Sequence, residues 1–208
     1  MAADAEEGRT ARKRKQILDA ARAVFLRNGY VGASMDEVAA LAAVSKQTVY
    51  KHFTDKEQLF THVATTAAGE FDDLTRAITT TLDADDPAKG LGTLARTFLG
   101  ALLRPDVLRL RRLVIAEADR FPHVGRAWYD EGFERVLDTL ADCFARLAGR
   151  GLLHLDDPRL AADHFMGMLL WIPVNRLMFR GGDDDPYAEA ELDRLAEAAV
   201  TAFLRAYG

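Results

Sequence analysis

The stretch from Ser34 to Phe53 constrains the fold most, because it reads as two short helices joined by a tight turn. Ser34 lies three residues before Glu37, which is the spacing of a capping box at the start of a helix. Ser45 is a second N-cap candidate, and Val49 and Phe53 follow it on one apolar face. Alanines between the two segments allow close helix approach. The stretch therefore predicts a helix-turn-helix.

The second of these helices presents an outer face without carboxylates. The side chains on that face are Lys46, Gln47, Thr48, Tyr50, Lys51 and His52. A helix that recognises DNA in the major groove contacts base edges with cationic and amide side chains and is supported by a preceding helix. The predicted pair of helices has both features. An ordinary helical hairpin with a solvated basic face has the same pattern, so the hairpin alone does not separate the two interpretations.

Charge is divided unevenly along the chain. Residues 9–52 hold nine Lys and Arg against three acids, although the whole chain carries a net charge of −5. The basic charge is thus confined to the part that would face phosphate, and the acidic remainder should point away from DNA. The basic run 12–15 lies at the start of a helix expected over 9–28, where the helix dipole disfavours cations, and this favours phosphate as an external partner.

Helical periodicity continues to the end of the chain, and no alternating strand pattern occurs, so the predicted fold is all-α throughout. Gly29 should end the first helix in a left-handed cap. A capping box at 54–57 should begin one long helix over about 56–82. The pairs Asp86-Pro87, Asp157-Pro158 and Asp185-Pro186 should each begin a helix. Further helices are expected at about 87–103, 106–119, 123–148, 158–180 and 186–206.

Several functional classes are disfavoured. No apolar run approaches the ~18–20 residues that span a bilayer, and the polar, acidic start is no secretory signal, so no membrane partner is expected. The single cysteine, Cys143, fits a reducing cytoplasm and an inert core position. The five histidines lack metal-ligand spacing, and there is no phosphate-cradling glycine loop or nucleophile elbow. We therefore expect no catalytic residue, metal or cofactor, and no enzymatic activity.

The amino-terminal part resembles the tetracycline-repressor (TetR) family of bacterial regulators over about residues 11–71. The matching residues are Ile17-Leu18-Asp19-Ala20-Ala21, Phe25, Asn28-Gly29-Tyr30, Ser34, Val38-Ala39, Val44-Ser45, Thr48-Val49-Tyr50-Lys51-His52-Phe53 and Lys56-Glu57-Gln58-Leu59. The resemblance implies a three-helix DNA-binding domain over 9–55 with its helix-turn-helix at 34–53. It also implies a carboxy-terminal helical bundle over 56–208 for ligand binding and dimerisation.

Side chains on the first turn of the second short helix reach furthest into a groove. Base contacts are therefore predicted for Lys46, Gln47, Thr48 and Lys51, the last of which could also contact phosphate. Phosphate contacts are predicted for Ser34, Tyr50, His52 and Lys56. The resemblance supports positions 48, 50, 52 and 56, whereas residue types at 46, 47 and 51 vary in the family and would set the operator sequence. Simple packing is the alternative for Tyr50 and His52.

Phe25, Tyr30, Val49 and Phe53 are expected in the core.

TetR-like proteins enclose a small-molecule pocket in the carboxy-terminal region, and residues 109–181 resemble the AefR-like subgroup. The predicted pocket residues are Phe98, Leu102, Leu113, Glu117, Trp128, Phe133, Leu137, His164, Phe165, Met168 and Trp171. Aromatic and methionine side chains at helical spacing are also typical of plain core. Trp128 and Trp171 suit an apolar ligand best, because each has a large rigid face with one donor.

The helix expected over 158–180 contains Pro173, which removes one backbone hydrogen bond and bends the axis. The bend would serve either a ligand or a partner surface, and the sequence does not decide between them. The flanking segment is too apolar for a solvated helix, because few polar positions remain among Trp171, Ile172, Val174, Leu177, Met178 and Phe179. Together with the last helix it predicts a two-fold four-helix interface formed by Val174, Leu177, Met178, Leu192, Leu195, Ala199 and Phe203.

These expectations describe a homodimeric, cytoplasmic transcriptional regulator. It would be a repressor that binds a palindromic double-stranded operator and is released by a small, largely apolar effector. An activator or a ligand-independent regulator of the same fold is the first alternative. An enzyme or helical adaptor that carries a basic hairpin is the second.

Overall fold

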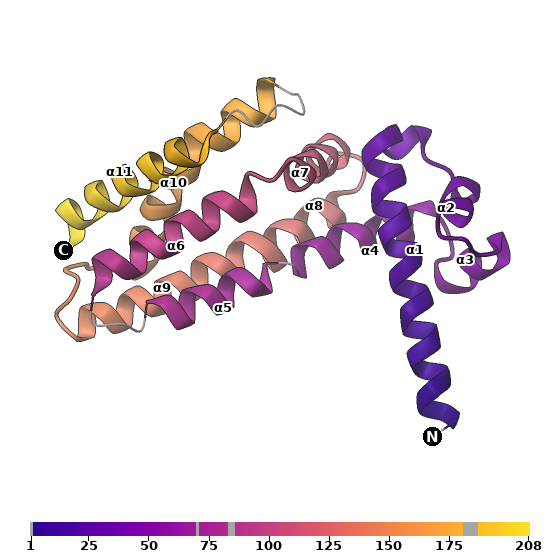
Figure 1. Ribbon diagram of the computed structural model, residues 1–208, viewed down its shortest axis with the longest axis horizontal. Coiled ribbons are helices and arrows are strands. Elements are labelled where there is room, and N and C mark those ends of the chain that lie inside the picture. The colour runs from indigo at the N-terminus through magenta and orange to yellow at the C-terminus, as the bar shows by residue number, and fades with distance from the viewer. Residues whose placement is uncertain (1, 70, 83–85, 181–186) are drawn as a thin grey trace. The chain divides into compact units, whose positions relative to one another are not determined.

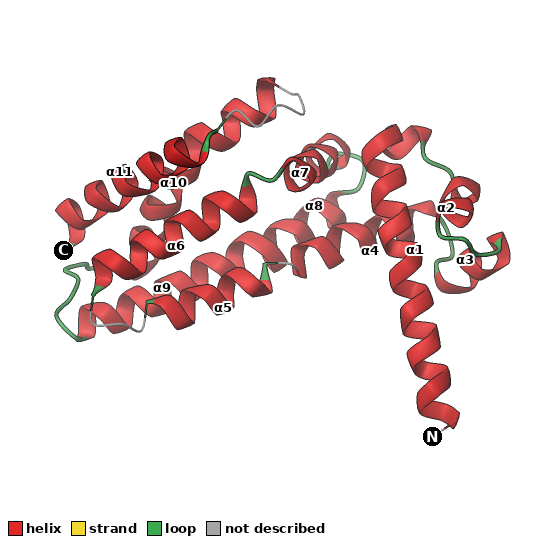
Figure 2. Ribbon diagram, viewed as in Figure 1, coloured by secondary structure: helices red, strands yellow, loops and turns green. Residues whose placement is uncertain are grey.

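The computed structural model describes residues 2–69, 71–82, 86–180 and 187–208. These residues form helices and loops and no strand, which confirms the predicted all-α fold (Figure 2). The chain divides into two compact units. The first comprises Met1–Ala68 and Leu113–Trp128, and the second comprises Gly69–Arg112 and Tyr129–Gly208.

The first unit contains α1 Ala2–Gly32, α2 Met35–Leu41, α3 Lys46–His52, α4 Lys56–Gly69 and α8 Pro122–Trp128 (Figure 1). Phe25 of α1 and Val49 and Phe53 at α3 are buried, as is Tyr30, so the predicted core positions are confirmed. The Tyr30 ring centroid lies 5.2 Å from that of Phe60 on α4 and 4.8 Å from that of Phe121 before α8. Aromatic contacts thus join segments far apart in the sequence into one core.

The second unit contains α5 Asp72–Thr81, α6 Pro87–Leu102, the π-helical turn η1 Tyr129–Glu134, α9 Arg135–Gly149, α10 Pro158–Arg180 and α11 Glu189–Tyr207. Helix α11 packs on α6 and α10, and α5 packs on α6 and α9. The Phe203 ring centroid lies 5.0 Å from that of Phe144 and 5.3 Å from that of Phe165 at the centre of this bundle. Cys143 is buried, as expected of an inert core residue. Helix α7, Pro105–Glu117, contributes residues to both units.

Two expected helices are divided in the structure. The long helix predicted over 56–82 is present as α4 and α5, which end at Gly69 and begin at Asp72. The helix predicted over 123–148 is present as α8, η1 and α9. A Cβ atom on Gly132 of η1 would lie 3.1 Å from the ring of Phe71, so glycine permits this close approach. Hydrophobic spacing predicted the helical run but not the change of helix type within it.

The end signals of the helices are mostly correct. Gly29 has a φ of 69°, which breaks the helical backbone within α1, as predicted. Asp86 Oδ1 accepts from the Lys89 amide at 3.1 Å and Asp157 Oδ1 from the Leu160 amide at 3.0 Å. The pair Asp185-Pro186 lies outside the described residues, and α11 begins at Glu189. The α4 cap is shifted from the prediction, because Asp55 Oδ1 accepts from the Gln58 amide at 2.8 Å.

The compact units do not coincide with the sequence-based domain boundary. The first unit continues through α4 to Ala68 and includes 113–128, whereas the helix pattern of the sequence placed the boundary near residues 53–60, with the domains divided at 55 and 56. The assignment of DNA binding to 9–55 and of effector binding and dimerisation to 56–208 stays a prediction. Helix α10 is continuous from Pro158 to Arg180, and Pro173 within it is buried.

Candidate nucleic-acid interface

Helix α2 is fixed to α1 at its amino-terminal end. Ser34 Oγ accepts a hydrogen bond from the Glu37 amide at 3.2 Å and so caps the helix as predicted. The Glu37 carboxylate binds α1. It accepts a hydrogen bond from Asn28 Nδ2 at 2.6 Å and forms an ion pair with Arg27. The Glu37 side chain, which the capping box predicted at the Ser34 amide, instead holds the helix-turn-helix against the first helix.

The turn between α2 and α3 is tight. Ala43 has a φ of 52°, a left-handed conformation that a residue with a Cβ adopts only at a cost in energy. The Val44 amide then donates to the Ala39 carbonyl at 3.1 Å. Ser45 Oγ accepts from the Thr48 amide at 3.1 Å and begins α3 as predicted. The turn thus places the first residues of α3 directly after α2.

The predicted DNA-facing side of α3 is turned outward. Lys46, Gln47, Tyr50 and Lys51 are exposed, and Thr48 and His52 are half-buried. Val49 on the opposite side has an exposed fraction of 0%. The buried face fixes the rotation of the helix, so its cationic and amide face is available to a groove. The individual base and phosphate contacts stay predictions.

Asp36 modifies this face in a way that the sequence did not reveal. Its carboxylate lies 2.7 Å from Lys46 Nζ, and both side chains are more than half exposed. The hydrogen bond from Lys46 to Asp36 raises the pKa of the ammonium group. Helical periodicity cannot detect this pair, because its members lie on two helices and meet only through the geometry of the turn.

Lys56 has a structural role within the first unit, and its predicted phosphate contact stays a prediction. Its Nζ donates to the carbonyl oxygens of Ala33 at 3.0 Å and Val31 at 3.2 Å, just after α1 loses its helical geometry. The ammonium also lies 4.6 Å from the centre of the Tyr30 ring. Lys56 satisfies carbonyls that the end of a helix leaves open, and it joins α4 to the α1–α2 connection.

Arg14 and two histidines form a basic cluster within the first unit. The pKa of His52 is lowered, first by burial and then by the positive charges of Lys51, Arg14 and Lys13. Arg14 Nη2 lies 3.1 Å from His62 Nδ1, and its guanidinium lies 5.3 Å from the centre of the Phe53 ring. Because a guanidinium only donates, His62 Nδ1 accepts in the neutral form. The predicted basic run 12–15 did not reveal this contact.

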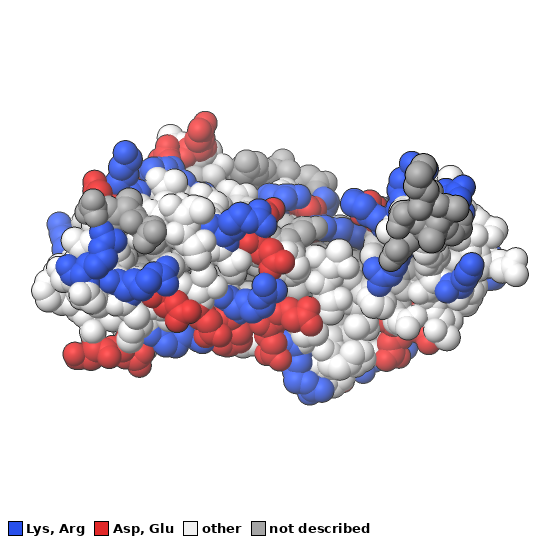
Figure 3. Space-filling view, turned by 90° about the horizontal axis from the view of Figure 1, so that it is seen from below, with Lys and Arg blue, Asp and Glu red and all other residues white. Residues whose placement is uncertain are grey.

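The surface charge agrees with the uneven charge of the sequence. On the face drawn in Figure 3, lysine and arginine side chains lie around α1 in the first unit, whereas the second unit carries a band of acidic side chains together with several basic ones. Basic residues on one unit favour phosphate there, and acidic residues on the other do not.

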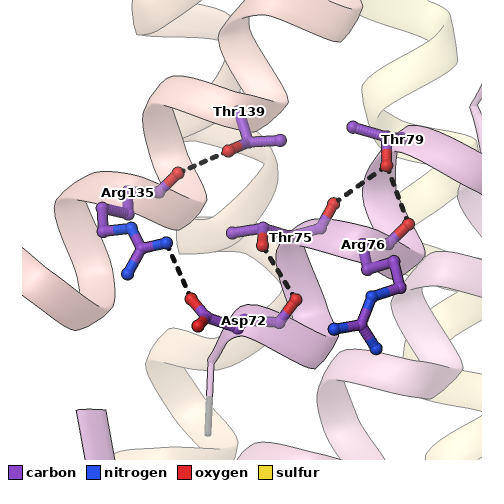
Figure 4. Close-up of a pocket in the computed structure, with 6 residues that line it drawn as sticks. All are labelled: Asp72, Thr75, Arg76, Thr79, Arg135 and Thr139. Carbon is purple, nitrogen blue, oxygen red and sulfur yellow. Dashed lines mark hydrogen bonds and ion pairs between the residues drawn. The ribbon is translucent and has the colours of Figure 1, made fainter. Parts of the chain in front are cut away.

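A polar pocket of about 380 Å³ lies on the second unit, between α5 and α9 (Figure 4). Its lining residues are Asp72, Thr75, Arg76, Thr79, Arg135 and Thr139. Arg135 lies 2.7 Å from Asp72 and Arg76 lies 2.8 Å from Asp73, so the charges are paired within the protein. The pocket includes none of the predicted pocket residues, and its polar lining does not suit an apolar effector.

The predicted pocket residues are dispersed. Leu113, Glu117 and Trp128 belong to the first unit and the other eight to the second. Phe98, Leu102 and Phe165 are buried core, and Phe133 and Leu137 are half-buried. His164, Met168 and Trp171 are exposed, and Trp171 has an exposed fraction of 68%. These three side chains lie on the outer side of α10 and do not line an enclosed pocket.

The predicted dimer residues also need correction. Val174, Ala199 and Phe203 are buried within the chain itself, so they are not available to a partner. Leu177, Met178, Leu192 and Leu195 are half-buried. Three other residues of the predicted apolar segment, Trp171, Ile172 and Phe179, are exposed, and with Met168 they form an apolar stripe on α10. The residues recur at spacings of three, four and seven along one helix face, which we call the α10 stripe.

Two further properties concern the described part of the chain. No group of three or more His, Cys, Asp and Glu side chains is placed there to hold a metal ion. None of the helices in that part has the length and apolar content needed to cross a membrane.

Comparison with known families matches both parts of the chain. Residues 17–63 match the model of bacterial regulatory proteins of the tetR family, and residues 89–208 match the AefR-like transcriptional repressor, C-terminal domain. A solved structure assigned to the TetR-family transcriptional regulators, from Mesorhizobium loti, is 50% identical over 96% of this chain and 98% of that chain, with a TM-score of 0.91.

Other relatives are more distant. The structure of the flavonoid-responsive regulator FrrA is 28% identical over 95% of this chain and 97% of that chain, with a TM-score of 0.74. The transcriptional repressor AcnR of Corynebacterium diphtheriae is 27% identical over 89% of this chain and 90% of its own length. Two more curated regulators are matched over less than a third of their own length.

Proposed function

The chain belongs to the TetR family of bacterial regulatory proteins, and on this premise we propose that it represses transcription by binding operator DNA through α3. Proteins of this family are DNA-binding transcriptional regulators and not enzymes. The AefR-like match covers 89–208, and that family is one of repressors. Repression is therefore the proposed sign of regulation, and the cytoplasm is the proposed place of action.

The observation that carries the proposal is the orientation of α3. Its apolar side is buried through Val49 and its first turn exposes Lys46 and Gln47. A recognition helix contacts base edges with the side chains of its first turn, while the preceding helix crosses the backbone. Ser34 begins that preceding helix, whose free amides favour a phosphate.

We propose that the repressor binds as a homodimer through the α10 stripe. Trp171, Ile172 and Phe179 have exposed fractions of 68%, 66% and 87%, which a soluble helix face rarely sustains without a partner. A two-fold dimer presents two recognition helices, so the operator would be palindromic, with half-sites about one helical turn apart.

The second unit is the proposed site of a small effector. A ligand that binds better to the state with weak DNA affinity shifts the population toward that state, and DNA weakens ligand binding by the same factor. Three chain segments cross between the units, at 68–69, 112–113 and 128–129, and these are the covalent routes for coupling. The relative FrrA is flavonoid-responsive, which supports an aromatic or apolar effector body.

DNA binding is tested by selecting sites from random duplexes and then measuring the affinity of the selected site. We expect a palindrome and a steep decrease in affinity with salt. Lys46→Ala should weaken binding by about 5- to 150-fold and relax the preference at one base pair. Tyr50→Ala should weaken binding to all sequences alike. Lys89→Ala, which removes an exposed lysine from α6, is the matched control and should leave affinity unchanged.

The alternatives predict other results. A protein without salt-dependent DNA binding, or one indifferent to both α3 changes, would be a helical adaptor or enzyme. A regulator that binds the palindrome but is not released by any ligand of the second unit would be ligand-independent. An activator would bind the operator and increase transcription from it in a reporter assay.

A further inference from the structure

Arg111 is an unusual arginine of the second unit. It lies on α7, is half-buried, and its guanidinium is 4.9 Å from the centre of the Phe133 ring. It makes no hydrogen bond and no ion pair with the described residues, and its guanidinium lies against the Phe133 ring. Removing a cation from water without a counter-charge costs free energy, so an unpaired, half-buried arginine indicates a binding role.

The other arginines of α7 and its start differ from Arg111. Arg104 pairs with Asp106 at 2.8 Å, and Arg112 Nη2 donates to the Leu177 carbonyl at 3.2 Å. Arg109 is exposed and also has an interaction partner. Every other half-buried arginine of the described part has a hydrogen bond, an ion pair or another contact. These arginines are Arg14, Arg22, Arg112, Arg159 and Arg176.

Two carboxylates that adjoin aromatic residues of this region in the sequence are already paired. Glu134, next to Phe133, lies 2.9 Å from Arg159 and accepts a hydrogen bond from the Tyr129 hydroxyl. Asp72, next to Phe71, pairs with Arg135 at 2.7 Å. Burial lowers the pKa of the Arg111 guanidinium, and no acidic group offsets that effect. The protein therefore supplies the cation but no matching anion.

Aromatic rings lie beside this cation. The ring centroid of Phe133 is 5.7 Å from that of Phe71 and 6.2 Å from that of Tyr129, with which it is stacked. Phe133 is half-buried and Tyr129 has an exposed fraction of 51%, so part of this aromatic surface is open. An apolar face next to one unpaired guanidinium is complementary to a molecule with an apolar body and one negative charge.

We propose that Arg111 binds the acidic group of an amphipathic organic anion, a carboxylate or sulfonate on an aromatic or other apolar body, whose body packs on Phe133 and Tyr129. The inference rests on the proposed role of the second unit in effector binding and gives the effector a charge. Helix α7 continues from Arg111 to Leu113, where the second segment of the first unit begins, so the ligand would act on a helix to which both units contribute residues.

The test compares two fluorescent probes with the same aromatic body. 8-Anilinonaphthalene-1-sulfonate carries a sulfonate, and N-phenyl-1-naphthylamine lacks it. Each is titrated into the full chain of wild type, Arg111→Met, Arg111→Lys and the control Arg109→Met, which changes an exposed arginine of the same helix. Because either probe also binds exposed apolar faces such as the α10 stripe, the difference between variants is the measured quantity.

We expect Arg111→Met to weaken sulfonate binding by about tenfold or more, with the neutral probe unchanged. Arg111→Lys should retain most of the sulfonate affinity, and Arg109→Met all of it. Arg111→Met should unfold at the same or a higher temperature than wild type, because it removes an unpaired half-buried charge. Equal effects on both probes, no effect on the sulfonate, or a loss of thermal stability in Arg111→Met would overturn the proposal.

DNA release is measured separately with the same probes. Arg111-dependent sulfonate binding that leaves operator affinity unchanged supports the anion site and contradicts ligand-responsive repression. If the neutral probe alone releases DNA and Arg111 shows no preference for the charged probe, the result supports ligand-responsive repression and contradicts the anion site.

Discussion

At the scale of single residues, Ala43 occupies a position whose backbone conformation favours glycine. Its φ of 52° lies in the left-handed region, and this turn sets the start of α3. Ala43→Gly should raise the free energy of unfolding by about 0.5–1 kcal/mol, because relief of the steric conflict exceeds the added flexibility of the unfolded chain. Urea denaturation measures the change. Ala42→Gly is the control and should destabilise, since Ala42 has a φ of −75° in the right-handed helical region.

A second residue-scale prediction concerns pH. The pKa of His62 is lowered by burial and then by the charge of Arg14, and the pKa of His52 is lowered in the same direction. The unfolded chain therefore binds more protons than the folded chain below about pH 6.5, and stability is lost as the pH falls through that value toward the folded pKa. Urea unfolding at pH 7.5 and 5.5 should show this loss.

The matched variant for this effect is His62→Gln, which keeps an acceptor for Arg14 but does not titrate. It should reduce the difference in stability between the two pH values. An unchanged difference would show that other groups dominate the acid response.

Single residues also show how far the sequence could predict the site. The outward side of α3 followed from the apolar spacing of Val49 and Phe53, and the structure confirms that these two are buried. Lys56 was assigned to phosphate with the support of the resemblance, and the structure adds that its ammonium binds two carbonyls near the end of α1. Spacing along a helix predicts which way a side chain points, but not which distant group it meets.

At the scale of elements, the contact between α2 and α3 suggests that Asp36 restrains Lys46. The carboxylate lies 2.7 Å from Nζ and adds a negative charge to the surface that should meet phosphate. Asp36→Asn should raise DNA affinity by about threefold or more at low salt, and the gain should decrease as salt screens the charge. Binding titrations at several salt concentrations measure it.

Asp73→Asn is the matched control for that prediction. It also removes a carboxylate that pairs with a basic side chain, Arg76 at 2.8 Å, but it lies on α5 in the second unit. An equal gain in both variants would mean that net charge, and not the restraint on Lys46, determines the effect.

Element boundaries show where local signals stop being sufficient. Asp86 and Asp157 cap their helices as predicted, because capping depends on atoms within one turn. The π-helical turn from Tyr129 to Glu134 was not predicted. Its glycine is in contact with Phe71 of a segment distant in the sequence, so the signal for that turn lies in packing.

At the scale of the whole molecule, the α10 stripe predicts the oligomeric state. Ile172→Glu places a charge in the middle of the exposed apolar face and should convert the proposed dimer to monomer at micromolar concentration, since a buried unpaired charge is strongly unfavourable. Light scattering after size-exclusion chromatography measures the mass. Leu41→Glu, at an exposed apolar position of the first unit, should leave the mass unchanged. A dimer that persists in Ile172→Glu would place the interface elsewhere.

By itself, the sequence determined the all-α class, the helix-turn-helix and its buried face, because periodicity, caps and turn residues act over a few positions. Only the tertiary structure decided that Phe203 belongs to the core, that Trp171 lies outside, and that Arg111 lacks a counter-charge. Each of these depends on which helix faces lie against one another across the bundle. Hydrophobic spacing identifies an apolar face, but the neighbours that cover it are set by packing among all the helices.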